Sequence, residues 1–87
     1  MIKSWTSTAW EDFTYWTKQD KKTLNRILQL IKDIDRNGYD GIGKPEPLSG
    51  DFRGYWSRRI DDKNRLVYRI KNDVIQIIQC GSHYRDK

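Results

Sequence analysis

The segment YWSRRIDDKNRLVYRIKNDVIQIIQC, residues 55–80, decides the fold. Residues 55–60, 65–70 and 74–80 are rich in β-branched and aromatic side chains, and short stretches of Asp, Asn and Lys separate them. Such runs, divided by turn-forming residues, are typical of paired strands. The last run is almost continuously apolar, which favours a central position in a sheet. The segment therefore predicts three consecutive strands.

The alternation of side chains along these strands predicts one apolar and one open face. Successive side chains of a strand point to opposite sides of the sheet. Arg59 and Arg65 are expected to project together from the open face, whereas Arg58 falls on the core side and is expected to reach an edge. The side chains expected to pack against helices are Trp56, Ile60, Leu66, Tyr68 and Ile70.

Upstream, a short strand at residues 2–5 and two helices are predicted. Thr8 and Glu11 have the spacing of a capping box, so the first helix is expected to begin at Thr8. The buried stripe of this helix is expected to hold Ala9, Trp10, Phe13 and Trp16.

Asp20 is a suitable cap for the second helix, and Asn37-Gly38 is a suitable stop. Its predicted apolar face comprises Leu24, Ile27, Leu28, Ile31 and Ile34. The opposite face carries Lys and Arg side chains, which suit either a solvated surface or part of an RNA-binding surface. The whole chain is thus expected to form a single α+β domain, residues 1–87. In it, two helices pack on one face of a small antiparallel sheet in the order β-α-α-β-β-β.

A long loop is predicted between the second helix and the C-terminal strands. Residues 38–54 contain five of the six glycines and both prolines. Pro45 and Pro47 restrict the backbone on either side of Glu46, so this carboxylate is expected on a stiff extended segment. Taken alone, such a Pro-Glu-Pro segment is better explained as an ordinary surface glutamate in a rigid loop.

The charge distribution favours a polyanionic partner. The net charge is +5, and residues 44–87 contribute 10 basic against 6 acidic side chains. Nucleic acid is the leading candidate, although a soluble basic protein without such a partner has the same composition. The chain has no membrane-length apolar run and no signal-like N-terminus, which predicts a cytoplasmic protein without a membrane partner. Its one His, one Cys and scattered acidic residues offer no usual metal-ligand spacing, so neither a metal nor another cofactor is expected.

The residues present could cleave RNA through its own 2′-hydroxyl. Such a reaction needs a base for the 2′-proton, an acid for the leaving 5′-oxygen, and cations at the phosphate. Glu46 is the best candidate for the base and His83 for the acid. Arg59 and Arg65 are the best candidates to bind the phosphate, because a guanidinium offers two parallel donors to its oxygens. Any small basic domain contains a Glu, a His and some Arg, so the pattern by itself is weak evidence.

Four stretches, taken together, resemble the YoeB family of toxins in the RelE superfamily of toxin–antitoxin systems. They are Gly43-Lys44-Pro45-Glu46-Pro47-Leu48, Trp56-Ser57-Arg58-Arg59-Ile60, Arg65-Leu66-Val67-Tyr68 and His83-Tyr84. The resemblance extends over essentially the whole chain and implies a microbial-ribonuclease-like fold. It also implies cleavage of mRNA on the ribosome without a cofactor.

By this resemblance, Glu46 corresponds to the general base, His83 to the general acid, and Arg59 and Arg65 to the phosphate-stabilising arginines. Tyr84 corresponds to a tyrosine that supports the substrate, and Lys44, Ser49 and Arg53 are expected to contact it as well. Ser49 stands where the family often has a lysine, a charge that Arg53 could replace, and Arg85-Asp86-Lys87 extend beyond the usual terminal His-Tyr. The implied partners are a YefM-type antitoxin and a second copy of the chain. Contact with operator DNA is expected only through the antitoxin.

Two other functions remain open from the sequence. One is a non-catalytic RNA- or ribosome-binding protein that blocks translation. The other is a gyrase inhibitor similar to the ParE toxins of the same superfamily, which needs no acid–base pair. The combination of Glu46, Arg65 and His83 argues against the second alternative.

Overall fold

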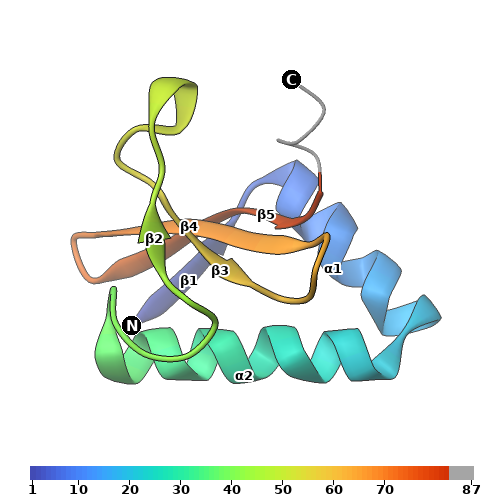
Figure 1. Ribbon diagram of the computed structural model, residues 1–87. Coiled ribbons are helices and arrows are strands. Elements are labelled where there is room, and N and C mark those ends of the chain that lie inside the picture. Colours follow the sequence, from blue (N-terminus) through green and yellow to red (C-terminus); the bar gives the residue numbers. More distant parts are fainter. Residues whose placement is uncertain (83–87) are drawn as a thin grey trace.

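Residues 1–82 are described by the computed structural model, in which two helices and a five-stranded sheet form one layer each (Figure 1). The predicted order, with two helices between a first strand and the C-terminal strands, is confirmed. The elements are β1 (Ile2–Trp5), α1 (Ser7–Gln19), α2 (Lys21–Asn37), β2 (Glu46–Pro47), the 3₁₀ helix η1 (Gly50–Phe52), β3 (Trp56–Arg59), β4 (Arg65–Lys71) and β5 (Val74–Gly81).

The sheet has the strand order β1-β5-β4-β3-β2 and is antiparallel except at one pair. β1 runs parallel to β5, which corrects the expectation of a wholly antiparallel sheet. Parallel neighbours need a long connection, and here the two helices and three further strands separate β1 from β5 in the chain. β2, which the sequence predicted only as a stiff segment, pairs with β3 and adds a fifth strand.

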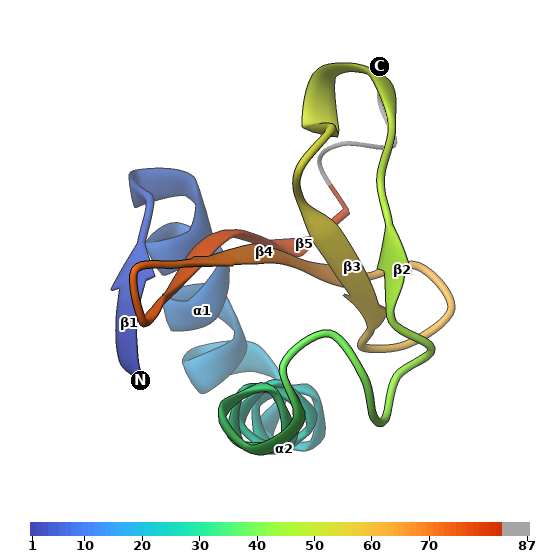
Figure 2. The ribbon, with the colours of Figure 1, turned by 90° about the vertical axis from the view of Figure 1, so that its left-hand side faces the viewer.

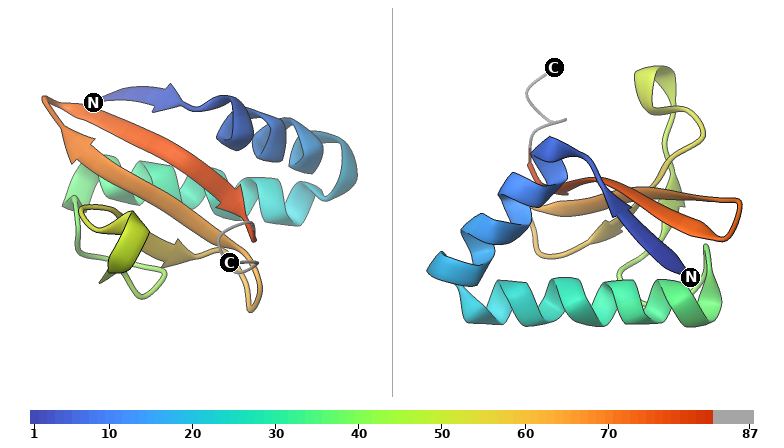
Figure 3. Two further views of the ribbon diagram at one scale, coloured as in Figure 1. Left: turned by 90° about the horizontal axis from the view of Figure 1, so that it is seen from above. Right: turned by 180° about the vertical axis from the view of Figure 1, so that it is seen from behind.

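Both helices pack on the same side of the sheet (Figures 2 and 3). α2 crosses beneath the strands, and α1 lies along β5. As predicted, Ile60, Leu66 and Tyr68 face the helices, with Trp56 and Ile70 packed at the margin of the core. The buried cluster comprises Ala9, Ile27, Leu30, Ile31, Ile34, Ile60, Leu66, Tyr68, Ile75, Ile77 and Cys80.

α1 begins one residue before the predicted start. Thr6, not Thr8, is its N-cap, and the Thr6 hydroxyl accepts a hydrogen bond from the Ala9 amide at 3.1 Å. The same hydroxyl donates to the carbonyl of Ile78 on β5, which ties the cap to the sheet. Trp10 was expected in the buried stripe but is 51% exposed; it stacks on Phe13 at the surface.

α2 has the predicted cap and stop, but its buried face is rotated from the predicted one. Asp20 accepts from the amides of Lys22 and Thr23, and Gly38 follows the last turn with a φ of 67°. Leu28 is 47% exposed, which makes its assignment to the core wrong. The buried positions are Thr23, Ile27, Leu30, Ile31 and Ile34.

β5 carries a bulge that the sequence did not indicate. The register changes between Val67 and Tyr68, whose partners are Gln79 and Ile77, so Ile78 has no partner on β4. Cys80 beyond the bulge is buried and its amide donates to the Asp12 carboxylate. Burial, with Asp12 nearby, raises the pKa of the Cys80 thiol to about 12, so this thiol stays protonated and structural.

Candidate active site on the open face of the sheet

The strand register brings Glu46, Arg59 and Arg65 onto one face of the sheet. Glu46 lies opposite Ser57, and Arg59, two residues further along β3, lies opposite Arg65. Laterally paired residues share a face, as do residues two apart in a strand. This face is the one turned away from the helices, because Leu66 and Tyr68 occupy the other. Arg59 and Arg65 are therefore cross-strand neighbours, as expected from the alternation.

Glu46 is held by backbone constraints and leaves its carboxylate free. It is exposed in β2 between two prolines, and its side chain makes no hydrogen bond or ion pair within residues 1–82. The backbone just before β2 has positive φ values at two consecutive residues, 81° at Gly43 and 50° at Lys44. At Gly43 a Cβ atom would lie 2.8 Å from Leu30 Cδ2, so only glycine fits without displacement.

The two arginines of this face differ in how far they are engaged. The Arg59 side chain is exposed and makes no hydrogen bond within the part of the chain described. Arg65 is 8% exposed, and its Nη1 donates to the carbonyls of Asp61 (2.6 Å) and Asn64 (3.1 Å). These bonds fix the guanidinium against the β3–β4 turn. Its Nε and Nη2 groups donate no hydrogen bond within residues 1–82. The Arg65 guanidinium is thus fixed in place by the fold, whereas the exposed Arg59 guanidinium is held by no hydrogen bond within residues 1–82.

Of the residues predicted to contact substrate, Lys44, Ser49 and Arg53 lie close to Glu46 in the chain. Lys44 and Arg59 line a pocket of about 340 Å³ together with Gly43, Arg26, Ile60, Asp61 and Asp62. Ser49 and Arg53 lie at the two ends of η1, in the segment that rises from the open face away from α2 (Figures 1 and 2). Both are exposed. His83, Tyr84 and the extension Arg85-Asp86-Lys87 lie outside the described residues; Gly81, the last residue of β5, is the register partner of Arg65.

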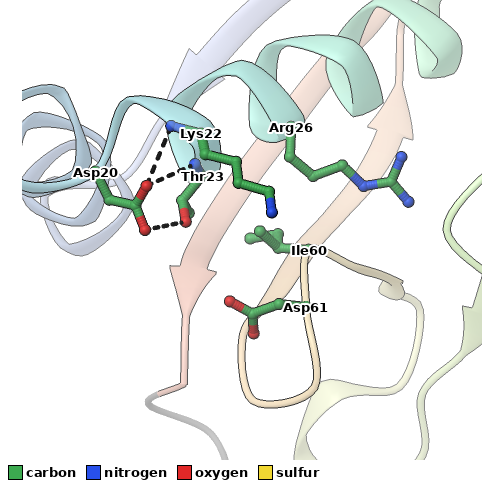
Figure 4. A pocket seen from close by; sticks show the side chains of 6 residues that line it. All are labelled: Asp20, Lys22, Thr23, Arg26, Ile60 and Asp61. Atoms are coloured by element: carbon green, nitrogen blue, oxygen red, sulfur yellow. Dashed lines mark hydrogen bonds between the residues drawn. The ribbon is translucent and has the colours of Figure 1, made fainter.

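Two further pockets border the sheet. One of about 340 Å³ lies between the start of α2 and the turn after β3, where Lys22 extends over Ile60 and Asp20 caps the helix (Figure 4). The other, of about 460 Å³, is lined by Glu11, Asp12, Tyr15, Trp16, Asn64, Gly81 and Ser82. Neither holds a metal-type cluster, since no three His, Cys, Asp or Glu side chains converge within residues 1–82.

Over the same residues, none of the helices has the length and apolarity needed to cross a bilayer.

The role of Arg58 was not predicted from the sequence. It was expected to reach an edge of the sheet, but its side chain is fully buried. The fold accommodates the buried charge because a carboxylate and three backbone carbonyls accept hydrogen bonds from the guanidinium. The carboxylate belongs to Asp33 on α2, and the carbonyls to Gly38, Asp40 and Ile42. No sequence pattern links an arginine in a strand to carbonyls of a loop 16 to 20 residues earlier.

The hydrogen bond from Arg58 holds the pKa of the Asp33 carboxyl below its ordinary value of 3.8. A carboxyl whose pKa is lower in the folded state stabilises that state when ionised. This contribution is complete above the unfolded-state pKa and disappears as the pH falls through the folded-state value. We therefore expect urea-unfolding midpoints to fall as the pH drops below about 4, and to fall less steeply in Asp33→Asn. Asp51→Asn, which alters an exposed carboxyl of η1, should keep the wild-type slope; equal slopes in wild type and Asp33→Asn would contradict the expectation.

Comparison with known proteins identifies the family. The family model for the YoeB-like toxin of bacterial type II toxin–antitoxin systems matches residues 5–84. The chain belongs to this family. A toxin YoeB of Streptomyces coelicolor is 52% identical over 81 residues, which cover 93% of this chain and 96% of the relative.

Solved YoeB structures from Staphylococcus aureus have the same fold. A heterotetrameric YoeB–YefM toxin–antitoxin complex contains a chain that is 44% identical, with a TM-score of 0.91 over 97% of this chain and 98% of that one. A YoeB dimer is also 44% identical, with a TM-score of 0.90 and the same coverage. The YoeB resemblance and the α+β fold predicted from sequence are therefore confirmed, and the protein is a toxin of a type II toxin–antitoxin system.

Proposed function

We propose that this toxin is a metal-independent endoribonuclease that cuts mRNA on the ribosome and so stops translation. The observation that carries the proposal is the shared open face of Glu46, Arg59 and Arg65, on which one carboxylate and two guanidinium groups are carried by three neighbouring strands. YoeB family membership supports it, since this family is one of ribonuclease toxins in general.

In the proposed reaction the RNA supplies its own nucleophile. Glu46 takes the proton of the 2′-hydroxyl while the 2′-oxygen forms a bond to the adjacent phosphorus. His83 gives a proton to the 5′-oxygen as the bond between this oxygen and the phosphorus breaks. The products are a 2′,3′-cyclic phosphate and a 5′-hydroxyl, and no water or electron is consumed. Arg59 and Arg65 bind the phosphate oxygens as charge concentrates on them. Tyr84, Lys44, Ser49 and Arg53 contact the flanking nucleotides.

The proposed protein partners follow from the S. aureus assemblies. A YefM-type antitoxin binds this chain, as in the S. aureus complex, and the toxin pairs with a second copy, as in the S. aureus dimer. The antitoxin also provides the only contact with operator DNA.

The test is a translation reaction with purified ribosomes and a defined mRNA. We expect cleavage of ribosome-bound mRNA, ends that carry a 2′,3′-cyclic phosphate, and no cleavage when the scissile nucleotide is 2′-deoxy. Blocked translation with intact mRNA would overturn the proposal in favour of a non-catalytic inhibitor. Loss of DNA supercoiling by gyrase, with mRNA intact, would instead indicate a ParE-like toxin.

A further inference from the structure

Arg58 is the one charged residue of the described chain with no exposed surface, and all of its hydrogen-bond donors are used. Its Nε donates to Tyr68 Oη at 3.1 Å. Its Nη1 donates to Asp33 Oδ2 and to the Ile42 carbonyl, and its Nη2 to the carbonyls of Gly38 and Asp40. A guanidinium has five N–H donors, and each has an acceptor here.

These bonds connect four separate parts of the fold. They join β3, which carries Arg58, to α2, to β4 and to the loop that leaves α2. Asp33 reinforces the loop by accepting from the Ile42 amide at 3.0 Å, and Tyr68 Oη donates to the Gly38 carbonyl at 3.2 Å. Tyr39 is held by stacking on Trp56 and Tyr68, whereas residues 40–42 are exposed, so the buried Arg58 guanidinium determines the path of the loop over these three residues.

The fixed loop leads directly to Glu46. After Ile42, the Gly43 carbonyl accepts from the Arg59 amide at 2.7 Å, and β2 then pairs with β3 through Glu46 and Ser57. Space at Gly43 is limited on the same side, because a Cβ there would lie 3.2 Å from Arg58 Cβ. Arg58 therefore holds the loop from the core side of β3, while Arg59, the next residue, faces the open side.

We propose that Arg58, held by Asp33 and Tyr68, is a positioning residue. It fixes the place of the Glu46 carboxylate relative to the phosphate-binding Arg59, so that Glu46 can take the proton of the 2′-hydroxyl. Arg58 does not touch the substrate; it acts through residues 38–43 and the register of β2. The inference rests on the proposed nuclease function and adds to it a network that reaches from the core to the general base. A small displacement of a reacting group lowers a rate strongly, so partial loss of the network should be visible in catalysis before the fold is lost.

The test uses mild variants that keep Arg58 itself. Asp33→Asn weakens its ion pair, and Tyr68→Phe removes one acceptor of its Nε together with the bond to Gly38. Ile34→Val is the matched control: it is a fully buried core position on α2, next to Asp33, and is not part of the network. Thermal unfolding ranks the three variants, and all assays are run well below the lowest melting temperature.

We expect both network variants to lower kcat for cleavage of ribosome-bound mRNA by about ten- to a hundred-fold, with KM nearly unchanged. Ile34→Val should retain the wild-type kcat at a comparable loss of stability. Amide exchange should accelerate at Ile42 and Leu48 in the network variants alone. Wild-type kcat in both network variants, or an equal decrease in Ile34→Val, would overturn this inference while the nuclease function stands. A wild-type protein that leaves mRNA intact would overturn both.

Discussion

Replacing Glu46 by Gln is expected to reduce mRNA cleavage by about 10²–10⁴-fold, the usual contribution of one general acid–base group. The amide has nearly the shape of the carboxylate but cannot take the 2′-proton. Glu46 is exposed and its side chain has no partner within residues 1–82, so the melting temperature and the affinity for ribosomes should stay close to wild type. Rates of cleavage on the ribosome, measured with excess toxin in a single turnover, report the chemical step directly.

Glu11→Gln provides the control for this variant. Glu11 is the chain's one other glutamate, exposed on α1 and remote in sequence from β2. The Glu11→Gln variant should cleave mRNA at the wild-type rate. Comparable cleavage by Glu46→Gln and wild type would exclude Glu46 as the base. Loss of activity in both glutamate variants would point to net charge rather than to proton transfer.

Replacing Arg58 by Ala is expected to cost about 3–5 kcal/mol of folding free energy, as removal of one partner of a buried ion pair usually does. The change leaves the Asp33 carboxylate and three backbone carbonyls without their donor. Small domains have a total stability of only about 5–15 kcal/mol, so a large part of the folded population is at risk. In a domain of this size the melting temperature should fall by roughly 15 °C or more.

Arg59→Ala separates burial from charge in this experiment. It removes the same side chain from the next position, but there the guanidinium is exposed and makes no hydrogen bond within the described residues. Its folding free energy should stay within about 0.5 kcal/mol of wild type. Urea unfolding of both variants gives the comparison, and equal losses of stability would show that the buried network contributes nothing specific.

Local sequence patterns predicted the individual helices and strands of this fold better than the way in which these elements pack and pair with one another. The period of the second helix, its Asp20 cap and its Gly38 stop are all present, because each depends on residues within one or two turns. Leu28 was misplaced because the orientation of α2 is set by the sheet above it, not by the helix. The parallel pairing of β1 with β5 joins residues more than seventy positions apart, a contact that periodicity does not encode.

The candidate site was predictable to the same extent. Strand alternation and a short turn were enough to place Arg59 beside Arg65. That Glu46 belongs to the same face depends on the pairing of β2 with β3, which follows from backbone conformations at Gly43 and Lys44 that sequence rules do not supply. Arg58 lay in the middle of the diagnostic WSRRI stretch, and only the three-dimensional arrangement separates its role from that of its neighbour.

The prolines on either side of Glu46 have a consequence for the behaviour of the protein at high concentration. β2 is an edge of the sheet, and an unpaired edge is where strands of other molecules add and aggregation begins. Pro45 and Pro47 have no amide proton, so an incoming strand would find donors missing at alternate positions. The short β2 edge is thereby blocked against intermolecular growth, which leaves β1 as the side of the sheet from which self-association by strand addition could start.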